Sequence, residues 1–230
     1  MKFNRYVVFA RLLPVILTST PFFVLYYFLL RTTIGDFISE LVRFQWISDV
    51  GFTLAVIFLL MQIGRFISKE LFEKRIFSGG LNFPTTNYLL HSDPQFSADY
   101  TKKIHDKIYG DFQIFIPSSE EESVYELDSR KKIVEAMSLI RVRVGKGNLV
   151  NQHNLEYGFI RNLMGGAIVA FLMSVANIIV FEWISFNQTA LIVSCFSAFI
   201  YLCLLISGKW LINSFASDYA KILIQEYMAK

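Results

Sequence analysis

Four long stretches without charged side chains dominate the pattern of hydrophobic and polar positions along this chain. The first, Leu12 to Leu30, has 19 residues, and the third, Asn162 to Phe181, has 20. The second, Val50 to Gly64, has 15, and the fourth lies within the 26 residues between Glu182 and Lys209. A helix needs about 20 apolar residues to cross the hydrocarbon core of a bilayer. The pattern therefore predicts four transmembrane helices, near residues 12–30, 47–65, 162–181 and 189–208.

The segment between the second and third predicted spans is polar and long enough for a small domain. Tyr100, Ile104 and Ile108 recur in it at helical spacing, after a Ser97 that can cap the helix. The predicted fold class is mostly α: a polytopic membrane protein with four transmembrane helices and a largely helical cytoplasmic insert between spans two and three. The expected division is an N-terminal transmembrane hairpin (1–65), a cytoplasmic domain (66–160), and a C-terminal transmembrane hairpin with a cytoplasmic tail (161–230).

Local patterns predict the limits of further elements in the insert. Ser118 and Ser119 precede an acidic run, which favours the start of a helix. The same helix is expected to continue to Val144, where a glycine turn ends it. A last helix is expected to begin near Gln152 and to continue into the third span. The segment Asp111–Pro117 alternates weakly between apolar and polar residues, which is compatible with a short strand.

The amino-acid composition agrees with a membrane protein and excludes several other classes. Hydrophobic residues make up 54% of the 230 residues, charged residues make up 18%, and the mean hydropathy is +0.44. This apolar content, with a net charge of only +3, excludes a disordered chain. The counts of 12 Gly, 5 Pro and 2 Cys exclude collagen-like and disulfide-rich scaffolds. The first apolar stretch is longer than the core of a cleaved signal peptide, which favours a retained span.

Basic residues are distributed unevenly among the segments that connect the predicted spans. The segment from Arg65 to Arg161 contains 14 Lys and Arg residues, whereas the connection between the third and fourth spans contains none. The connection between the first and second spans contains only Arg31 and Arg43. Because cytoplasmic loops are enriched in Lys and Arg, both termini and the insert are predicted to lie in the cytoplasm.

The hydrophilic side chains well inside the predicted spans are uncharged. The absence of Asp, Glu, Lys, Arg and His from these positions argues against an active transporter, which usually needs such groups at depth. Thr18, Ser19, Ser174 and Asn177 are polar residues of this kind. They could line a passive pore, or they could hold neighbouring helices together through hydrogen bonds.

Small residues and a proline suggest how the spans pack and bend. Gly166, Ala170 and Ser174 recur every four residues on the third span, a spacing that lets helices approach closely within or between subunits. A homo-oligomer, most simply a tetramer, is expected on this basis. Pro21 lies in the first span, where it could act as the hinge of a gate or simply bend the helix.

The sequence lacks familiar catalytic motifs. It contains no Walker loop, no G-x-S-x-G and no H-E-x-x-H. His153 and Glu156 are three residues apart and could share one face of a helix, but two ligands do not make a metal site. A polar contact between them is the simpler interpretation. The chain is therefore not expected to be an enzyme, to hold a metal or to need a cofactor.

The densest group of polar residues lies just before the third span. Its candidate ligand-binding members are Arg141, Arg143, Lys146, Asn148 and His153. Cations, amide donors and a glycine turn together suit an anion, which could be a nucleotide, an oligonucleotide or the head group of a membrane lipid. In a symmetric oligomer these groups would form a charged ring close to the mouth of a pore.

Several motifs of the insert carry a resemblance to a known group of proteins. They are Phe83–Pro84–Thr85–Thr86, Asp111–Phe112, Val144–Gly147, and the stretch from His153 to Gly166. Together they resemble small four-span bacterial membrane proteins of anti-phage defence operons, in particular the membrane effectors paired with nucleotidyltransferases in Hailong and CBASS-type systems. The resemblance covers the insert and the start of the third span. It implies an oligomeric channel or disrupting effector of the bacterial inner membrane, controlled by a cytoplasmic nucleotide signal from a nucleotidyltransferase encoded nearby.

Two functions from different classes are compatible with these features. The first is a ligand-gated, ion-conducting pore that depolarises the inner membrane during infection. The second is a membrane sensor or scaffold that recruits a soluble defence protein through the insert, as in Kiwa-type systems. The first predicts ion flux in liposomes, whereas the second predicts a stable protein partner and no flux.

Overall fold

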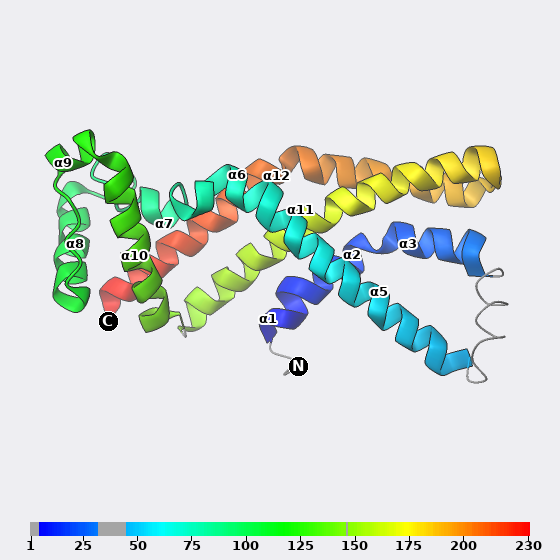
Figure 1. Cartoon of the computed structure of the whole chain (residues 1–230), viewed down its shortest axis with the longest axis horizontal. Coiled ribbons are helices and arrows are strands. Elements are labelled where there is room, and N and C mark those ends of the chain that lie inside the picture. The colour runs from blue at the N-terminus through cyan, green and yellow to red at the C-terminus, as the bar shows by residue number, and fades with distance from the viewer. Residues whose placement is uncertain (1–4, 32–44, 146) are drawn as a thin grey trace. The chain divides into compact units, whose positions relative to one another are not determined.

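The computed structural model describes residues 5–31, 45–145 and 147–230, and for residues 45–53 it describes the backbone alone. Every regular element in these ranges is a helix, which confirms the mostly α fold class (Figure 1). The chain divides into two compact units. Unit 1 is built from Met1–Lys69 and Gly158–Lys209, and unit 2 from Glu70–Tyr157 and Trp210–Lys230.

Unit 1 contains the apolar helices. Its first part consists of α1 (Arg5–Val7), η1 (Val8–Leu12), α2 (Leu13–Thr18), α3 (Thr20–Leu25), η2 (Tyr26–Leu30) and α5 (Gln45–Ile67). Its second part consists of α11 (Asn148–Ile179) from Gly158 onward, η5 (Val180–Ile184), and α12 (Gln188–Ala229) as far as Lys209. The segments η1, η2 and η5 are π-helical turns.

Two helices of the described residues are long and apolar enough to cross a membrane: α11 with η5, and α12. The segments Arg5–Thr18 and Thr20–Leu30 add a third crossing if the pair, bent by 42°, forms one span. The structure therefore supports a membrane protein and matches two of the four predicted spans, or three with the bent pair. Four spans remain a prediction.

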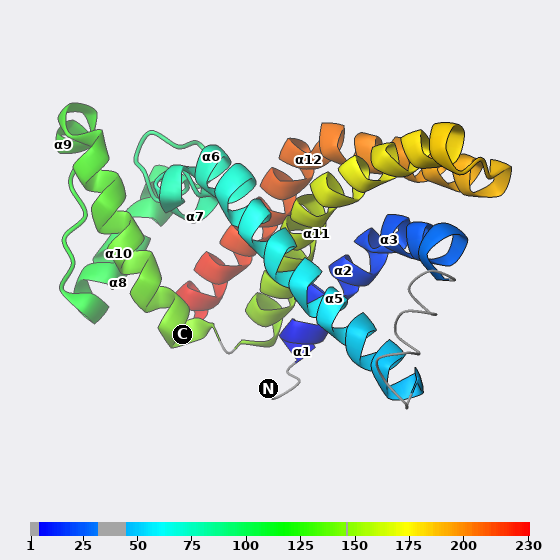
Figure 2. The same cartoon turned by 45° about the vertical axis from the view of Figure 1, so that its right-hand side comes forward.

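Glycine allows the helices of unit 1 to approach closely. A Cβ atom on Gly165 of α11 would lie 2.7 Å from the Cβ atom of Ser68, closer than such atoms approach in proteins. A Cβ atom on Gly166 would lie 2.6 Å from the hydroxyl of Thr18 in α2. The close packing predicted for Gly166 therefore occurs within one chain. At the other end of the unit, α11 and α12 run side by side (Figure 2). The ring of Phe181, in η5 between them, is fully buried.

Unit 2 contains shorter, more polar helices. They are α6 (Lys74–Phe77), η4 (Ser78–Gly80), α7 (Pro84–Asn87), α8 (Ala98–Phe112), α9 (Ser119–Val124) and α10 (Glu126–Val144). The π-helical segment η3 (Ser68–Glu73) follows α5 without a break, so the second apolar helix continues past residue 65. The left-handed conformation of Ser78, with φ of 48°, ends α6.

Serine side chains cap two helices, and both helices begin where the sequence predicts. The hydroxyl of Ser97 accepts a hydrogen bond from the amide of Tyr100 at the start of α8. Ser118 and Glu121 form a capping box at the start of α9, in which each side chain accepts from the other residue's backbone N–H. Both caps satisfy amides that the first helical turn leaves without a partner.

Three details of the insert differ from the prediction. The segment Asp111–Pro117 is not a strand, because α8 continues to Phe112 and the backbone then runs irregularly to Ser118. The helix expected between Ser119 and Val144 is broken at Tyr125, which separates α9 from α10. The last helix begins at Asn148, four residues before the expected start near Gln152.

The C-terminal part of α12 belongs to the core of unit 2. Ile212, Leu223, Ile224 and Tyr227 are fully buried. The ring of Tyr227 stacks on that of Phe112, and its hydroxyl donates to Asp111, both at the end of α8. The expected cytoplasmic domain, residues 66–160, therefore corresponds to a unit that begins at Glu70, ends at Tyr157 and also includes Trp210–Lys230. The latter segment is not a free tail.

Candidate functional site

The first apolar helix contains two prolines. A proline cannot donate a hydrogen bond, so the carbonyl four residues earlier loses its usual helical partner. Pro14 affects the carbonyl of Ala10, and Pro21 affects the carbonyl of Leu17. Between the prolines α2 ends at Thr18 and α3 begins at Thr20, where the chain bends by 42°.

Side chains from other helices supply the missing donors. The amide Nδ2 of Asn162, in α11, donates to the carbonyl of Ala10 at 2.6 Å. The hydroxyl of Tyr201, in α12, donates to the carbonyl of Leu17 at 2.8 Å. Unsatisfied carbonyls are costly in an apolar environment, so these two bonds make the interrupted first helix compatible with burial.

Asn177 provides a third hydrogen bond to the same helix. Its Nδ2 atom donates to the carbonyl of Pro21 at 2.7 Å, and the whole side chain is buried. Its Oδ1 atom has no hydrogen-bond partner among the residues that the structure describes. We name Asn162, Asn177 and Tyr201 the proline brace, because they connect α11 and α12 to the carbonyls around Pro14 and Pro21.

The other polar residues expected to line a pore form hydrogen bonds within their own helices. The Thr18 hydroxyl donates to the carbonyl of Pro14 at 2.9 Å, and the Ser19 hydroxyl donates to that of Ile16 at 2.8 Å. The Ser174 hydroxyl donates to the carbonyl of Ala170 at 2.8 Å. Thr18, Ser19, Ala170 and Ser174 are all buried. In this conformation they face the interior of one chain and do not form a polar outer surface.

The two arginines of the predicted anion site point to different neighbours. Arg141 lies over the ring of Phe83, with its guanidinium carbon 5.7 Å from the ring centre. Arg143 forms an ion pair of 3.0 Å with Asp111 and also lies over the ring of Phe112. Residues two positions apart on a helix face different directions, so α10 separates these two side chains. Both remain exposed on one side.

The remaining members of the predicted anion site lie around the start of α11. Asn148 is exposed in the first turn of this helix. The Nδ1 atom of His153 lies 3.2 Å from a carboxylate oxygen of Glu156, as expected for a polar contact between these residues. Lys146 lies outside the residues that the structure describes. The positions of Arg141, Arg143, Asn148 and His153 alone do not define a single pocket.

Carboxylates of unit 2 already contact this basic region. Glu226, near the end of α12, accepts a hydrogen bond of 3.2 Å from the amide of Val150 in the first turn of α11. Its carboxylate also lies against the Cα of Gly147, where a side chain would collide with it. The Asp111 that pairs with Arg143 accepts a further hydrogen bond of 2.9 Å from the hydroxyl of Tyr227. An external anion would therefore compete with carboxylates of the chain itself.

Sequence reasoning found some of these residues and missed others. Pro21 and Asn177 were singled out, but Tyr201 reads as an ordinary aromatic residue of the fourth span until its hydroxyl is seen at the carbonyl of Leu17. A proline in an apolar helix does predict an unpaired carbonyl four residues earlier. From that unpaired carbonyl, the sequence could have predicted a polar side chain on another span as its hydrogen-bond donor. The roles of Asp111 and Glu226 depend on contacts between distant segments, which no local pattern predicts.

Comparisons with known proteins leave the function to be inferred from this chain's own residues. No protein-family model matches it, and no curated protein or solved structure matches it either. The geometry of the proline brace and the charges of unit 2 are therefore the observations from which a function has to follow.

Proposed function

We propose that the chain crosses a bacterial inner membrane four times, with unit 2 and both termini in the cytoplasm. The spans would be formed by the segments from α1 to η2, by α5, by α11 with η5, and by the first half of α12. The length of α5, 23 residues, supports its role as the additional span. The 14 basic residues between Arg65 and Arg161 support the cytoplasmic side of unit 2.

This topology can be tested with reporter tags. Tags at either terminus or at Ser119 should report cytoplasm, and a tag within residues 182–188 should report the opposite side of the membrane. A periplasmic signal from Ser119 would contradict the proposed placement of unit 2.

We further propose that the protein is a membrane effector of bacterial anti-phage defence, which forms an oligomeric ion-conducting pore under the control of a cytoplasmic nucleotide or oligonucleotide. The observation that carries the pore is the proline brace. Interrupted helices occur at membrane depth where protein buries them or where they line a water-filled cavity. Three side-chain hydrogen bonds hold this interruption, and a plain membrane anchor has no need of such an arrangement.

A pore of this kind needs several copies of the chain. Four helices enclose little space, and the polar side chains of unit 1 that were expected to line a pore are turned inward. A lumen would therefore form between subunits, for which we propose a tetramer. The conformation described above, with Thr18, Ser19, Ser174 and Asn177 buried, corresponds to a non-conducting state. Opening would require the first helix to change its bend at Pro21.

The proposed control by an anion relies on the basic side chains at the cytoplasmic start of the third span. Arg141 and Arg143 keep exposed surface that a phosphate could contact. The helix that follows them, α11, continues without interruption from Asn148 to Ile179 and carries both asparagines of the brace. A ligand that favours one position of this helix would shift the balance between closed and open states.

The experiment that tests the pore is ion flux from liposomes that contain the purified protein. Wild-type protein should release trapped potassium slowly, because the conformation described above is closed. Tyr201→Phe should increase the release, because it removes the 2.8 Å bond to the Leu17 carbonyl, leaves only the longer bond from Thr20 at 3.3 Å, and so weakens the closed conformation. Tyr27→Phe is the matched control, since it removes the hydroxyl of a tyrosine that is 61% exposed. Absence of flux from every variant would contradict the pore, and a stable soluble partner without flux would favour the scaffold function.

A further inference from the structure

Three large apolar side chains protrude where α9 meets α10. Val124, Tyr125 and Leu127 are 69%, 65% and 54% exposed, and they lie within four consecutive residues. We name them the α9–α10 tip. They belong to the polar unit of the chain, whose core holds buried side chains such as Ile104 and Ile133. Other apolar side chains of this unit, such as Phe115 and Val142, are exposed too, but the tip places three of them within four residues. Contiguous exposed apolar residues of this kind commonly mark binding surfaces.

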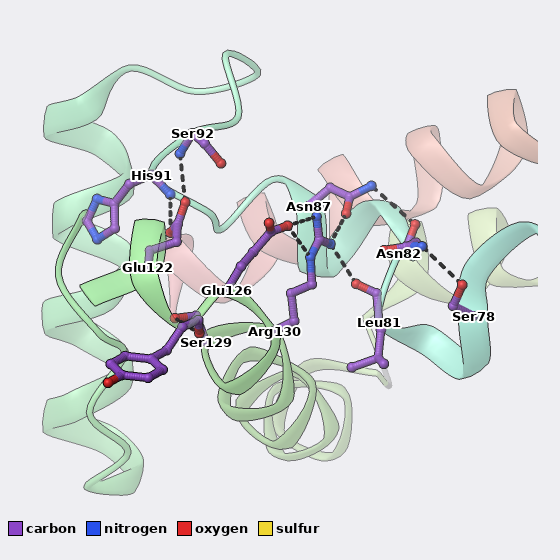
Figure 3. A network of polar contacts seen from close by, with 11 residues as sticks. Ser78, Leu81, Asn82, Asn87, His91, Ser92, Glu122, Glu126, Ser129 and Arg130 are labelled. Carbon is purple, nitrogen blue, oxygen red and sulfur yellow. Dashed lines mark hydrogen bonds and ion pairs between the residues drawn. The ribbon is translucent and has the colours of Figure 1, made fainter. Parts of the chain in front are cut away.

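Hydrogen bonds fix the backbone before the tip. Glu122, in α9, is buried, and its two carboxylate oxygens accept from the amides of His91 and Ser92 at 2.8 and 3.0 Å (Figure 3). The capping box of Ser118 and Glu121 holds the start of the same short helix. The last turn of α9 is therefore attached to the preceding loop, and Val124 is held in its exposed position.

A second group of bonds fixes the backbone after the tip. The Nη1 atom of Arg130, in α10, donates to the carbonyl of Leu81 and to Oδ1 of Asn87 at 2.8 and 2.7 Å (Figure 3). The fully buried hydroxyl of Ser129 donates to the carbonyl of Tyr125 at 3.3 Å. The backbone at the break between α9 and α10 is thus fixed on both sides by hydrogen bonds. Side chains on a rigid backbone lose little conformational freedom when they bind a partner.

Acidic residues predominate in the sequence around the tip. Between Ser118 and Ser129 the sequence contains five acidic residues and no Lys, Arg or His. Glu122 is used internally, whereas Glu120, Glu121, Glu126 and Asp128 are exposed around the apolar residues. Two of these carboxylates have cation partners: Glu126 pairs with Arg130, which also donates to Leu81 and Asn87, and Asp128 pairs with the exposed Lys131 at 3.5 Å. The surface therefore presents apolar side chains inside an acidic rim.

We propose that the α9–α10 tip is the docking site for a soluble protein, which binds through a Lys- and Arg-rich segment that carries an apolar anchor. Opposite charges complement the acidic rim and align the segment, while Val124, Tyr125 and Leu127 supply the apolar contact. A lipid surface is a poor match, because the anionic cytoplasmic leaflet attracts basic segments and repels acidic ones. The inference does not depend on the pore, since a pore subunit and a scaffold could both receive such a partner.

The test is site-specific photo-crosslinking of the full-length protein in its native membrane, with p-benzoyl-phenylalanine in place of Tyr125. The expected product joins this position to a soluble protein, at a peptide rich in Lys and Arg that mass spectrometry identifies. The Glu120→Gln/Glu121→Gln double variant should reduce the yield about tenfold, which corresponds to the loss of two favourable charge contacts. The matched control is Lys102→Gln/Lys103→Gln on α8, which should leave the yield unchanged.

A direct binding measurement then uses a synthetic peptide that copies the crosslinked segment. Fluorescence anisotropy should show binding to the purified wild-type protein, weakened about tenfold or more by Val124→Ser/Leu127→Ser and by raised salt. Circular dichroism checks that each variant is folded. Crosslinking to lipid, to a second copy of the chain or to nothing would overturn the proposal, as would a peptide whose binding ignores these changes. The flux assay on the same variants should remain at the wild-type level, so failure of the docking site and failure of the pore are distinguishable.

Discussion

At the scale of single residues, the first helix shows how a backbone N–H missing from a proline is compensated by a hydrogen-bond donor on another helix. Pro14 and Pro21 each lack a backbone N–H, and each affected carbonyl is met by a side chain from another helix. A hydrogen bond between membrane helices contributes about 0.6–2 kcal/mol in general. The bonds of Asn162 and Tyr201 therefore stabilise unit 1 modestly and, more importantly, select one arrangement of its helices.

Glycine on α11 gives the clearest residue-scale prediction. Gly165→Ala should destabilise the protein in mild detergent by about 1–3 kcal/mol, because the added Cβ atom would collide with Ser68 and overpack the contact. Gly166→Ala should act in the same direction through Thr18. Thermal unfolding monitored by circular dichroism measures both effects.

The matched control for this prediction is Gly110→Ala on α8. A Cβ atom at Gly110 would meet no atom within 4 Å, so alanine should stabilise the helix by about 0.5–1 kcal/mol through its higher helix propensity. Equal melting temperatures for Gly165→Ala and Gly110→Ala would show that the contact between Ser68 and α11 is looser than described. If Gly166→Ala kept the stability of the wild type but no longer formed oligomers, Gly166 would instead contact another subunit.

At the scale of elements, local chemistry predicts where helices start better than where they break. Ser97 was recognised as a cap because a hydroxyl next to a helix start satisfies free amides, and the helix start after Ser118 was recognised from its acidic run. The break at Tyr125 has no proline or glycine to announce it. It depends on Glu122 and Arg130, whose partners His91, Ser92, Leu81 and Asn87 lie at least 30 residues away in the chain. Such breaks follow from tertiary contacts, so the sequence pattern misses them.

The loop that leads into α8 gives a prediction about pH at the same scale. Burial lowers the pKa of His105 from its usual 6.5, opposed by its hydrogen bond to the carbonyl of Leu89. His91, whose ring lies 4.9 Å away, acts in the same direction as burial, whereas the nearby Glu122 and Asp106 raise the pKa. The unfolded chain therefore takes up this proton first. The contribution of His105 to stability is complete above pH 6.5 and declines as the pH falls toward the lower folded value.

A comparison of melting temperatures tests this dependence. Wild-type protein should lose stability between about pH 7.5 and about pH 5.5, and His105→Gln should lose less over the same range, because glutamine does not titrate and still offers a donor for Leu89. His153→Gln is the matched control, since His153 lies on α11 beside Glu156 and away from the Leu89 carbonyl. Parallel pH profiles for wild type and His105→Gln would assign the acid sensitivity to other groups.

At the scale of the whole molecule, the sequence predicted the helical class and the apolar stretches, because periodicity and hydropathy are local properties. It did not predict that a segment after the last apolar stretch completes the core of the polar unit. Residues 210–230 mix apolar with charged positions in a way that also suits an exposed amphipathic tail. Only the burial of Leu223, Ile224 and Tyr227 shows that other helices of unit 2 cover their apolar side.

The last prediction follows from this burial. Deletion of residues 210–230 should prevent unit 2 from folding, because it removes Ile212, Leu223, Ile224 and Tyr227, which are fully buried. Each such side chain stabilises a core by about 1.5–3 kcal/mol, and a whole domain is stable by only about 5–15 kcal/mol. Limited proteolysis of membranes should therefore cut the deleted variant within residues 70–157, at concentrations of trypsin that leave the full chain intact. Removal of Ala229 and Lys230 alone, both exposed, should change nothing. If the deleted variant resists trypsin as the full chain does, the segment is a tail after all, and the contacts of Glu226 and Tyr227 contribute little to holding unit 2 together.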